Sequence, residues 1–288
     1  MQEYPSDMIA EKTTTPHMKL GEILEDYNED VDRRLPEWAR RSNPIVRRHL
    51  GRYWKTLLPE PAFLLKVILV EAVIIALTLP FPVLIDLTLP AITASILLFP
   101  VALYGYAYLL LAVGSNAATS IVIETQNDTV TLLRTIPTPL TQILASKVAA
   151  ALWRQVENLT ILIMAISIMG LPLIISHYAT IYPLVEYPIV SRVAMILSVV
   201  ISLIRLVLEP FMIGAIGMMA GATLPTRSSA VITTVLIGFF YFLAINMARL
   251  VPMPWPLHYI VDFVLPVVLP VLITWVGFRT TEYLLARN

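Results

Sequence analysis

The chain has no cysteine, and this absence excludes disulfide bonds, thiolate metal sites and cysteine nucleophiles. It is also poor in charge. Asp, Glu, Lys and Arg make up 14% of its 288 residues, whereas soluble domains carry about 25%. Hydrophobic residues make up 57% of the chain, and the mean hydropathy is +0.76. We therefore expect an all-α, polytopic membrane protein rather than a soluble fold.

Sequence motifs of catalysis are missing as well. There is no G-x-x-x-x-G-K-[ST], so the chain does not bind ATP through a P-loop. There is also no H-E-x-x-H and no G-x-S-x-G, and the four histidines are scattered along the chain. We expect no enzyme activity, no metal and no cofactor in this chain. The first residues contain no apolar run after a basic start, so we expect no cleaved signal peptide.

The basic residues are unevenly distributed, although the net charge is zero: ten of the 20 Lys and Arg lie before residue 56. Residues 1–42 read as a cytoplasmic N-terminal tail. Within it, residues 19–38 combine apolar residues at helical spacing with many carboxylates, which predicts a short acidic amphipathic helix. This segment is either a solvated tail or a helix that binds a partner.

Residues 43–60 predict an amphipathic helix in the membrane interface. Asn43 suits the cap and Pro44 the first turn. One face is apolar and aromatic and the opposite face is basic, a pattern typical of helices that lie in the interface; the alternative is a helix packed within a soluble domain. Anionic headgroups fit the charge better than nucleic acid, because a span follows directly. The expected lipid contacts are Arg47, Arg48, Arg52, Trp54 and Lys55.

Residues 61–288 predict a domain of six transmembrane helices, since each crossing needs ~20 apolar residues. Pro100 predicts a kink and Pro210 a bend or break. The last span begins at Leu257, or a short re-entrant piece, Leu257–Val264, precedes it. The expected spans are Phe63–Leu79, Ala91–Val113, a third that starts near Thr141 and is fully apolar over Leu159–Ile175, Ile189–Ala222, Ala230–Leu250 and one that ends near Phe278.

The positive-inside rule sets the expected orientation. Lys and Arg outside the spans concentrate in the N-terminal segment, in residues 114–147, in residues 223–229 and in the C-terminal tail. The opposite loops, 80–90, 176–190 and 251–257, carry none. We therefore expect a multi-pass protein of the cytoplasmic (inner) membrane with both termini in the cytoplasm.

A polar island, Ile121–Lys147, interrupts the apolar sequence between the second and third spans. It reads IVIETQNDTVTLLRTIPTPLTQILASK. An acidic residue, a Thr, a Leu pair, two prolines and a Lys at the foot of the next helix follow one another. This order resembles the loop after the second span in type-2 permeases of ATP-binding-cassette (ABC) transporters, with Asp128 where that family usually has Gly and Thr138-Pro139 where it usually has Leu-Ser or similar. The matching residues are Glu124, Thr129, Leu132, Leu133, Pro137, Ile143, Leu144 and Lys147.

The resemblance implies a permease subunit, expected to be an exporter, that couples ATP hydrolysis on separate ATPase subunits to substrate movement. ATP-Mg would bind the partner ATPase, and a second copy or a homologous chain would complete the permease. Residues 217–230 resemble more faintly the family's turn between the fourth and fifth spans. The residues expected to dock the ATPase are Glu124, Thr129, Leu132, Leu133, Arg134, Pro137, Pro139 and Lys147.

Other functions stay open at the level of sequence. The island could merely cap the bundle or dock a neighbour that is not an ATPase. The chain could be a non-transporting scaffold or accessory subunit that has kept the permease fold. It could also be an ion-coupled transporter that uses Glu71 and Glu209, although no inverted halves with broken helices are visible. Lipids, drugs, glycans and peptides are all compatible substrates.

Ionisable residues within spans are costly and mark functional candidates. Arg205 and Glu209 are four residues apart, so we expect them to pair along one helix face, as a structural ion pair or as part of a transport site. Glu71 lies mid-span without a partner on its own helix. It could pair with Arg205, bind a backbone donor or line a pathway. Near the outer surface, Arg249 and Asp262 carry no predicted role, and neither does Asp86.

Overall fold

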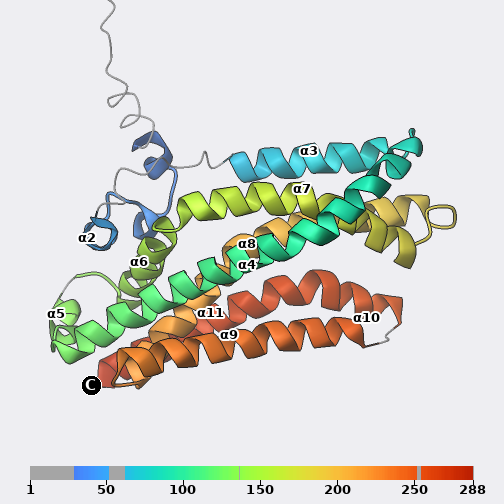
Figure 1. Ribbon diagram of the computed structural model, residues 1–288. Coiled ribbons are helices and arrows are strands. Elements are labelled where there is room, and N and C mark those ends of the chain that lie inside the picture. Colours follow the sequence, from blue (N-terminus) through green and yellow to red (C-terminus); the bar gives the residue numbers. More distant parts are fainter. Residues whose placement is uncertain (1–28, 52–61, 136, 252–253, 288) are drawn as a thin grey trace, which may run out of the picture.

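The computed structural model describes residues 29–51, 62–135, 137–251 and 254–287 (Figure 1). Helices dominate these residues and no strand occurs among them, which confirms the all-α fold class. Half of the predicted acidic helix, residues 19–28, lies outside them; of residues 29–38, only 29–33 are α-helical, and a short 3₁₀ turn begins at Glu37. The elements are η1 (Glu37–Ala39), α2 (Pro44–Leu50), α3 (Phe63–Leu77), α4 (Val83–Gln126), α5 (Val130–Thr135), α6 (Leu140–Trp153), α7 (Val156–Ile181), α8 (Pro188–Thr223), α9 (Arg227–Leu250), α10 (Trp255–Tyr259), the π-helix η3 (Ile260–Val264) and α11 (Leu265–Arg287).

Five helices of the described chain are long and apolar enough to cross a membrane, which identifies an integral, multi-pass membrane protein. They are α4, α7, α8, α9 and the run Leu257–Arg287. Helix α3 begins at Phe63, as the sequence predicts, but it has 15 residues. That length is about 22 Å of helix, shorter than the ~30 Å hydrocarbon layer. The prediction of six crossings therefore depends on α3 and stays a prediction.

Helix α8 is the central element of the bundle. It packs against α3, α4, α7, α9 and α11, and Met195, Leu203, Met212 and Ile216 are among its fully buried side chains. Of the bend or break predicted at Pro210, the break does not occur, because α8 is continuous through this residue; the bend stays a prediction. Proline is tolerated inside membrane helices where neighbouring groups satisfy the carbonyl that it leaves without a donor.

Glycines let α4 and α8 approach closely. A Cβ on Gly217 would lie 2.5 Å from the carbonyl oxygen of Gly114, and one on Gly221 would lie 2.5 Å from that of Ala118. Gly217 and Gly221 form a G-x-x-x-G pair, a spacing that brings membrane helices into backbone contact. The two longest helices therefore meet backbone to backbone near their α5 end.

Two predicted spans differ from the helices observed. The second does not end at Val113: α4 begins at Val83 and continues to Gln126, so the first part of the polar island is helical. The third is not one helix, because α6 and α7 separate at Arg154 and Gln155. Side-chain bonds account for this break. The Trp153 indole donates to the Ala39 carbonyl, and the Arg154 guanidinium donates to that of His49.

The last crossing forms without a re-entrant piece. Residues 255–287 are helical throughout, and the π-helix η3 leads directly into α11. Of the two alternatives that the sequence leaves open, the span that begins near Leu257 is therefore the one observed. π-Helical segments are rare and frequently occur at functional sites.

The α4–α8 contact predicts a specific sensitivity to one added methyl group. Gly217→Ala should lower the thermal midpoint of the detergent-purified protein, because the new Cβ meets backbone that cannot rotate away; overpacking of this kind costs about 1–3 kcal/mol. Gly170→Ala is the matched control, since its Cβ would meet only the Ile166 side chain at 3.9 Å. Equal midpoints for the two variants would contradict the close packing.

Candidate functional site

The polar island begins with a tightly bonded helix end. Asp128 follows the cap of α4 with φ +55°, a left-handed conformation that glycine adopts freely and Asp tolerates better than most residues. The Thr129 N–H donates to the carbonyl of Glu124, and the Asp128 N–H donates to that of Thr125. This pair of bonds is the Schellman motif, whose left-handed position is usually glycine. Asp128 therefore occupies a glycine position without changing the turn.

A buried ion pair joins the start of the island to its end. The Lys147 ammonium contacts the Glu124 carboxylate, and the two side chains are 1% and 17% exposed. Burial lowers the pKa of Lys147, and the Glu124 charge opposes that shift. The Thr129 hydroxyl adds a bond of 3.2 Å to the Glu124 carbonyl. Glu124, Thr129 and Lys147 thus form one bonded unit that ties α4 to α6.

Helix α5 lies at one end of the bundle, between the ends that this unit joins (Figure 1). The backbones of Leu132, Leu133 and Arg134 lie within α5, and their side chains are outside the described part of the structure. After α5, Pro137 is exposed and Pro139 caps α6. The amide of Gln126 donates to the Pro225 carbonyl at 2.9 Å, so the α8–α9 turn lies at this same end.

The N-terminal segment packs on α6 near this site. Asn43 caps α2 by accepting from the Ile45 N–H, and Pro44 is its first residue, which confirms the predicted start of this helix. Val46 and Leu50 are buried against Ala149 and Ala150 of α6. The apolar face of the described helix therefore contacts protein, and α2 ends at Leu50.

The basic residues of this helix divide into two groups. Arg47 and Arg48 are exposed beside α6. Arg52, Trp54 and Lys55 lie outside the described residues. Contact of these five side chains with lipid headgroups stays a prediction.

A small polar pocket of about 390 Å³ lies between α2, α4 and α6. The Glu124–Lys147 pair forms part of its lining, together with Arg48, His49 and Arg154. Burial, reinforced by the positive charges of Lys147, Arg154 and Arg48, lowers the pKa of His49 to about 4. His49 is therefore neutral at physiological pH. Glu124 is the acidic side chain among the basic side chains that line the described pocket.

The predicted pairing of Arg205 with Glu209 is confirmed, with 2.7 Å between nitrogen and oxygen. Glu209 is 1% exposed and accepts two further bonds, from the Tyr106 hydroxyl at 2.7 Å and from the Tyr241 hydroxyl at 3.3 Å. These tyrosines come from α4 and α9. A carboxylate with this many donors is a structural link between three helices, which favours the structural alternative for this pair.

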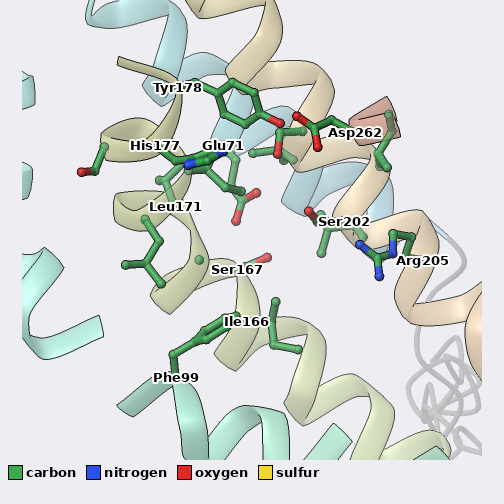
Figure 2. A pocket seen from close by; sticks show the side chains of 18 of the residues that line it. Glu71, Phe99, Ile166, Ser167, Leu171, His177, Tyr178, Ser202, Arg205 and Asp262 are labelled. Carbon is green, nitrogen blue, oxygen red and sulfur yellow. The ribbon is translucent and has the colours of Figure 1, made fainter. Parts of the chain in front are cut away.

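Glu71 lies in a different setting from Glu209. Its side chain points into a cavity of about 910 Å³ between α3, α4, α7 and α8 (Figure 2). Arg205 lines the same cavity but forms its ion pair with Glu209, not with Glu71. No basic side chain in the described ranges forms an ion pair with Glu71. Of the alternatives for this residue, the lining of a pathway is the one the geometry favours.

Two charged residues without a predicted role also line this cavity. Arg249 and Asp262 form an ion pair with 3.5 Å between nitrogen and oxygen, across the end of α9 and the π-helix. The sequence analysis missed this pair because each residue reads alone as a surface charge beside a span. The prolines at positions 252, 254 and 256, between the last two predicted spans, were the available signal. No group of three or more metal-ligating side chains occurs in the part of the chain that the structure describes.

The buried ion pair at the island predicts an asymmetric effect of mutations. Glu124→Gln should destabilise the protein by about 3–5 kcal/mol, because it leaves Lys147 buried without its counter-ion. The double variant Glu124→Gln/Lys147→Met should recover much of that loss in thermal unfolding. Glu282→Gln is the control, since it pairs with the exposed Arg279 and is itself only half-buried, and pairs at the surface contribute about 0–1 kcal/mol. A double variant as unstable as the single one would contradict the pairing.

Comparisons with protein-family models, with curated proteins and with solved structures find no match to this chain. The function proposed next therefore depends on the geometry of the two sites and on the sequence resemblance of the island.

Proposed function

We propose that this chain is the membrane-spanning subunit of an ATP-driven transporter of the type-2 ABC permease kind. One observation carries the proposal: Glu124, Thr129 and Lys147, three residues of the resemblance, are joined in one bonded unit beneath α5. Asp128, the residue that departs from the family pattern, takes the left-handed conformation that a glycine would take there. The island is therefore a built structural element rather than a linker.

Helix α5 is the element that docks the ATPase in this proposal. It projects between two helix ends that are fixed by the buried ion pair, and Pro137 and Pro139 limit the backbone that follows it. A displacement of α5 would therefore move α4 and α6 rather than be absorbed by a flexible loop. The partner ATPase binds ATP-Mg and hydrolyses ATP. This chain converts the resulting motion of the ATPase into a movement of its own membrane helices.

Helix α4 supplies the connection from α5 to the membrane cavity. It has 44 residues, about 66 Å of helix. Its last residues carry Glu124, and its earlier residues Ile92, Ile96 and Phe99 line the cavity that contains Glu71. A rigid tilt of α4 would change the cavity's width, and this is the motion that coupling requires.

The remaining parts of the proposal follow from the same arrangement. The protein lies in the cytoplasmic membrane, with α5, both termini and the α8–α9 turn on the cytoplasmic side, because the basic residues outside the spans gather there. A second copy or a homologous chain completes the transporter. Helix α3 supplies the sixth crossing. Lipid headgroups contact the basic side chains of the interfacial helix predicted at residues 43–60. We propose export as the direction, and no contact with nucleic acid.

The proposed docking role predicts the effect of charges on α5. Leu132→Asp/Leu133→Asp should abolish co-purification of an ATPase with the tagged full-length chain from its native membrane, because two carboxylates cannot enter an apolar groove without a large desolvation cost. Val185→Asp is the control: Val185 is 95% exposed in the turn between α7 and α8, at the opposite end of the bundle. An ATPase that stays bound to the double variant, or none bound to the wild type, would contradict the proposal.

A further inference from the structure

The cavity of about 910 Å³ lies in the half of the bundle away from α5. Its lining comes from the early part of α4, the late part of α7, the early part of α8 and the region from Arg249 to Asp262, while α5 follows the other end of α4 (Figure 1). Pockets for small molecules have volumes of about 300–1,000 Å³, so a drug-sized molecule fits. The walls combine aliphatic side chains with hydroxyl, histidine and charged side chains.

Glu71 is the charged group of this cavity that lacks a counter-ion in the described structure. It is 7% exposed, and Figure 2 shows its carboxylate directed into the cavity, next to the hydroxyl of Ser167. Ser167 is 8% exposed, and its hydroxyl is the hydrogen-bonding neighbour of the Glu71 carboxylate. Two buried polar side chains therefore face the same space, and the described residues offer the Glu71 carboxylate a hydroxyl neighbour but no counter-ion.

The other charges around the cavity cancel one another. Arg205 is paired with Glu209, and Arg249 is paired with Asp262. With the histidines counted as neutral, the lining and its paired groups carry one net negative charge, which is that of Glu71. An unpaired charge in a membrane interior is costly, so a ligand with one positive charge would remove the imbalance.

The apolar and aromatic side chains of the cavity indicate what the uncharged part of the ligand is. Ile92, Ile96, Ile166 and Ile174 supply apolar surface. Phe99 and Tyr178 add aromatic rings, whose faces attract cations. A strongly hydrated inorganic ion would leave this apolar surface uncovered, whereas an organic cation would cover it.

We propose that this cavity binds a hydrophobic monovalent cation, such as an amphipathic amine, with the Glu71 carboxylate as its counter-ion and the Ser167 hydroxyl as a second polar contact. That the cation is the transported substrate rests on the proposed permease function. Binding itself requires only this chain, and the two claims are therefore tested apart.

The test uses a matched pair of probes on the purified full chain in lipid nanodiscs, without an ATPase. Tetraphenylphosphonium and tetraphenylborate have the same shape and opposite charge, so their difference isolates the charge of the site. Equilibrium dialysis against empty nanodiscs should show saturable binding of the cation and none of the anion. Absence of saturable cation binding, as expected if Glu71 only carries a proton, would overturn the proposal, and so would equal binding of the two probes.

Variants then assign the charge to Glu71. Glu71→Gln should weaken cation binding by about 30-fold or more, since it removes a buried charged partner, whereas Glu71→Asp should keep the preference for the cation. Glu186→Gln is the control, because Glu186 is exposed at the same end of the bundle and does not line the cavity. The thermal midpoint of each variant is measured as well, so that binding is compared between proteins of equal stability. Wild-type affinity in Glu71→Gln, or loss in Glu186→Gln, would overturn the assignment.

Discussion

The arrangement of this protein at its α5 end depends on the ion pair between Glu124 and Lys147. This ion pair joins the two ends of the polar island, which would otherwise be an unsupported polar segment between apolar helices. The Lys147 ammonium is nearly inaccessible to solvent, so it is stable there only with its carboxylate beside it. The pair fixes the end of α4 relative to α6, and α6 in turn supports the N-terminal segment through Trp153 and Arg154. α5 is therefore presented on a rigid base.

The same interaction connects the two sites. α4 runs from the ion pair, past its close contact with α8 at Gly217, to the wall of the cavity that contains Glu71. Glu209 joins α8 to α4 and α9 within the bundle. Packed helices that meet through glycine backbones and buried hydrogen bonds move as units rather than bend independently. In the proposed function, this is why a motion of α5 at one end reaches the cavity at the other.

Much of the fold follows from the sequence, because lipid imposes two strong requirements: long apolar segments and internally bonded backbone. These requirements predict the all-α class and the long apolar helices, and the Asn43-Pro44 pair predicts the capped start of α2. They do not predict the extension of α4 into the first residues of the polar island or the separation of α6 from α7. Both coincide with contacts between distant residues, Gln126 with the Pro225 carbonyl and Arg154 with the His49 carbonyl, which periodicity along one helix does not encode.

The candidate site, too, contains some features that the sequence predicts and others that it does not. Helical spacing predicts the Arg205–Glu209 pair, since the partners are four residues apart. The island's pattern selects Glu124 and Lys147, but their contact depends on how the chain between them folds back, which begins with the left-handed turn at Asp128. The surroundings of Glu71 could not be predicted, because five separate stretches of chain form the cavity around it.

The central claim is that α5 contacts an ATPase, and the absence of native cysteine allows a direct test. Thr131 is exposed on α5, so a single Thr131→Cys carrying a benzophenone maleimide places a photo-crosslinker on this helix. Illumination of native membranes, followed by mass spectrometry, should identify a P-loop ATPase crosslinked to Thr131→Cys and none crosslinked to Val185→Cys. Crosslinks from Thr131→Cys to lipid or to unrelated proteins, with no ATPase among them, would contradict the account.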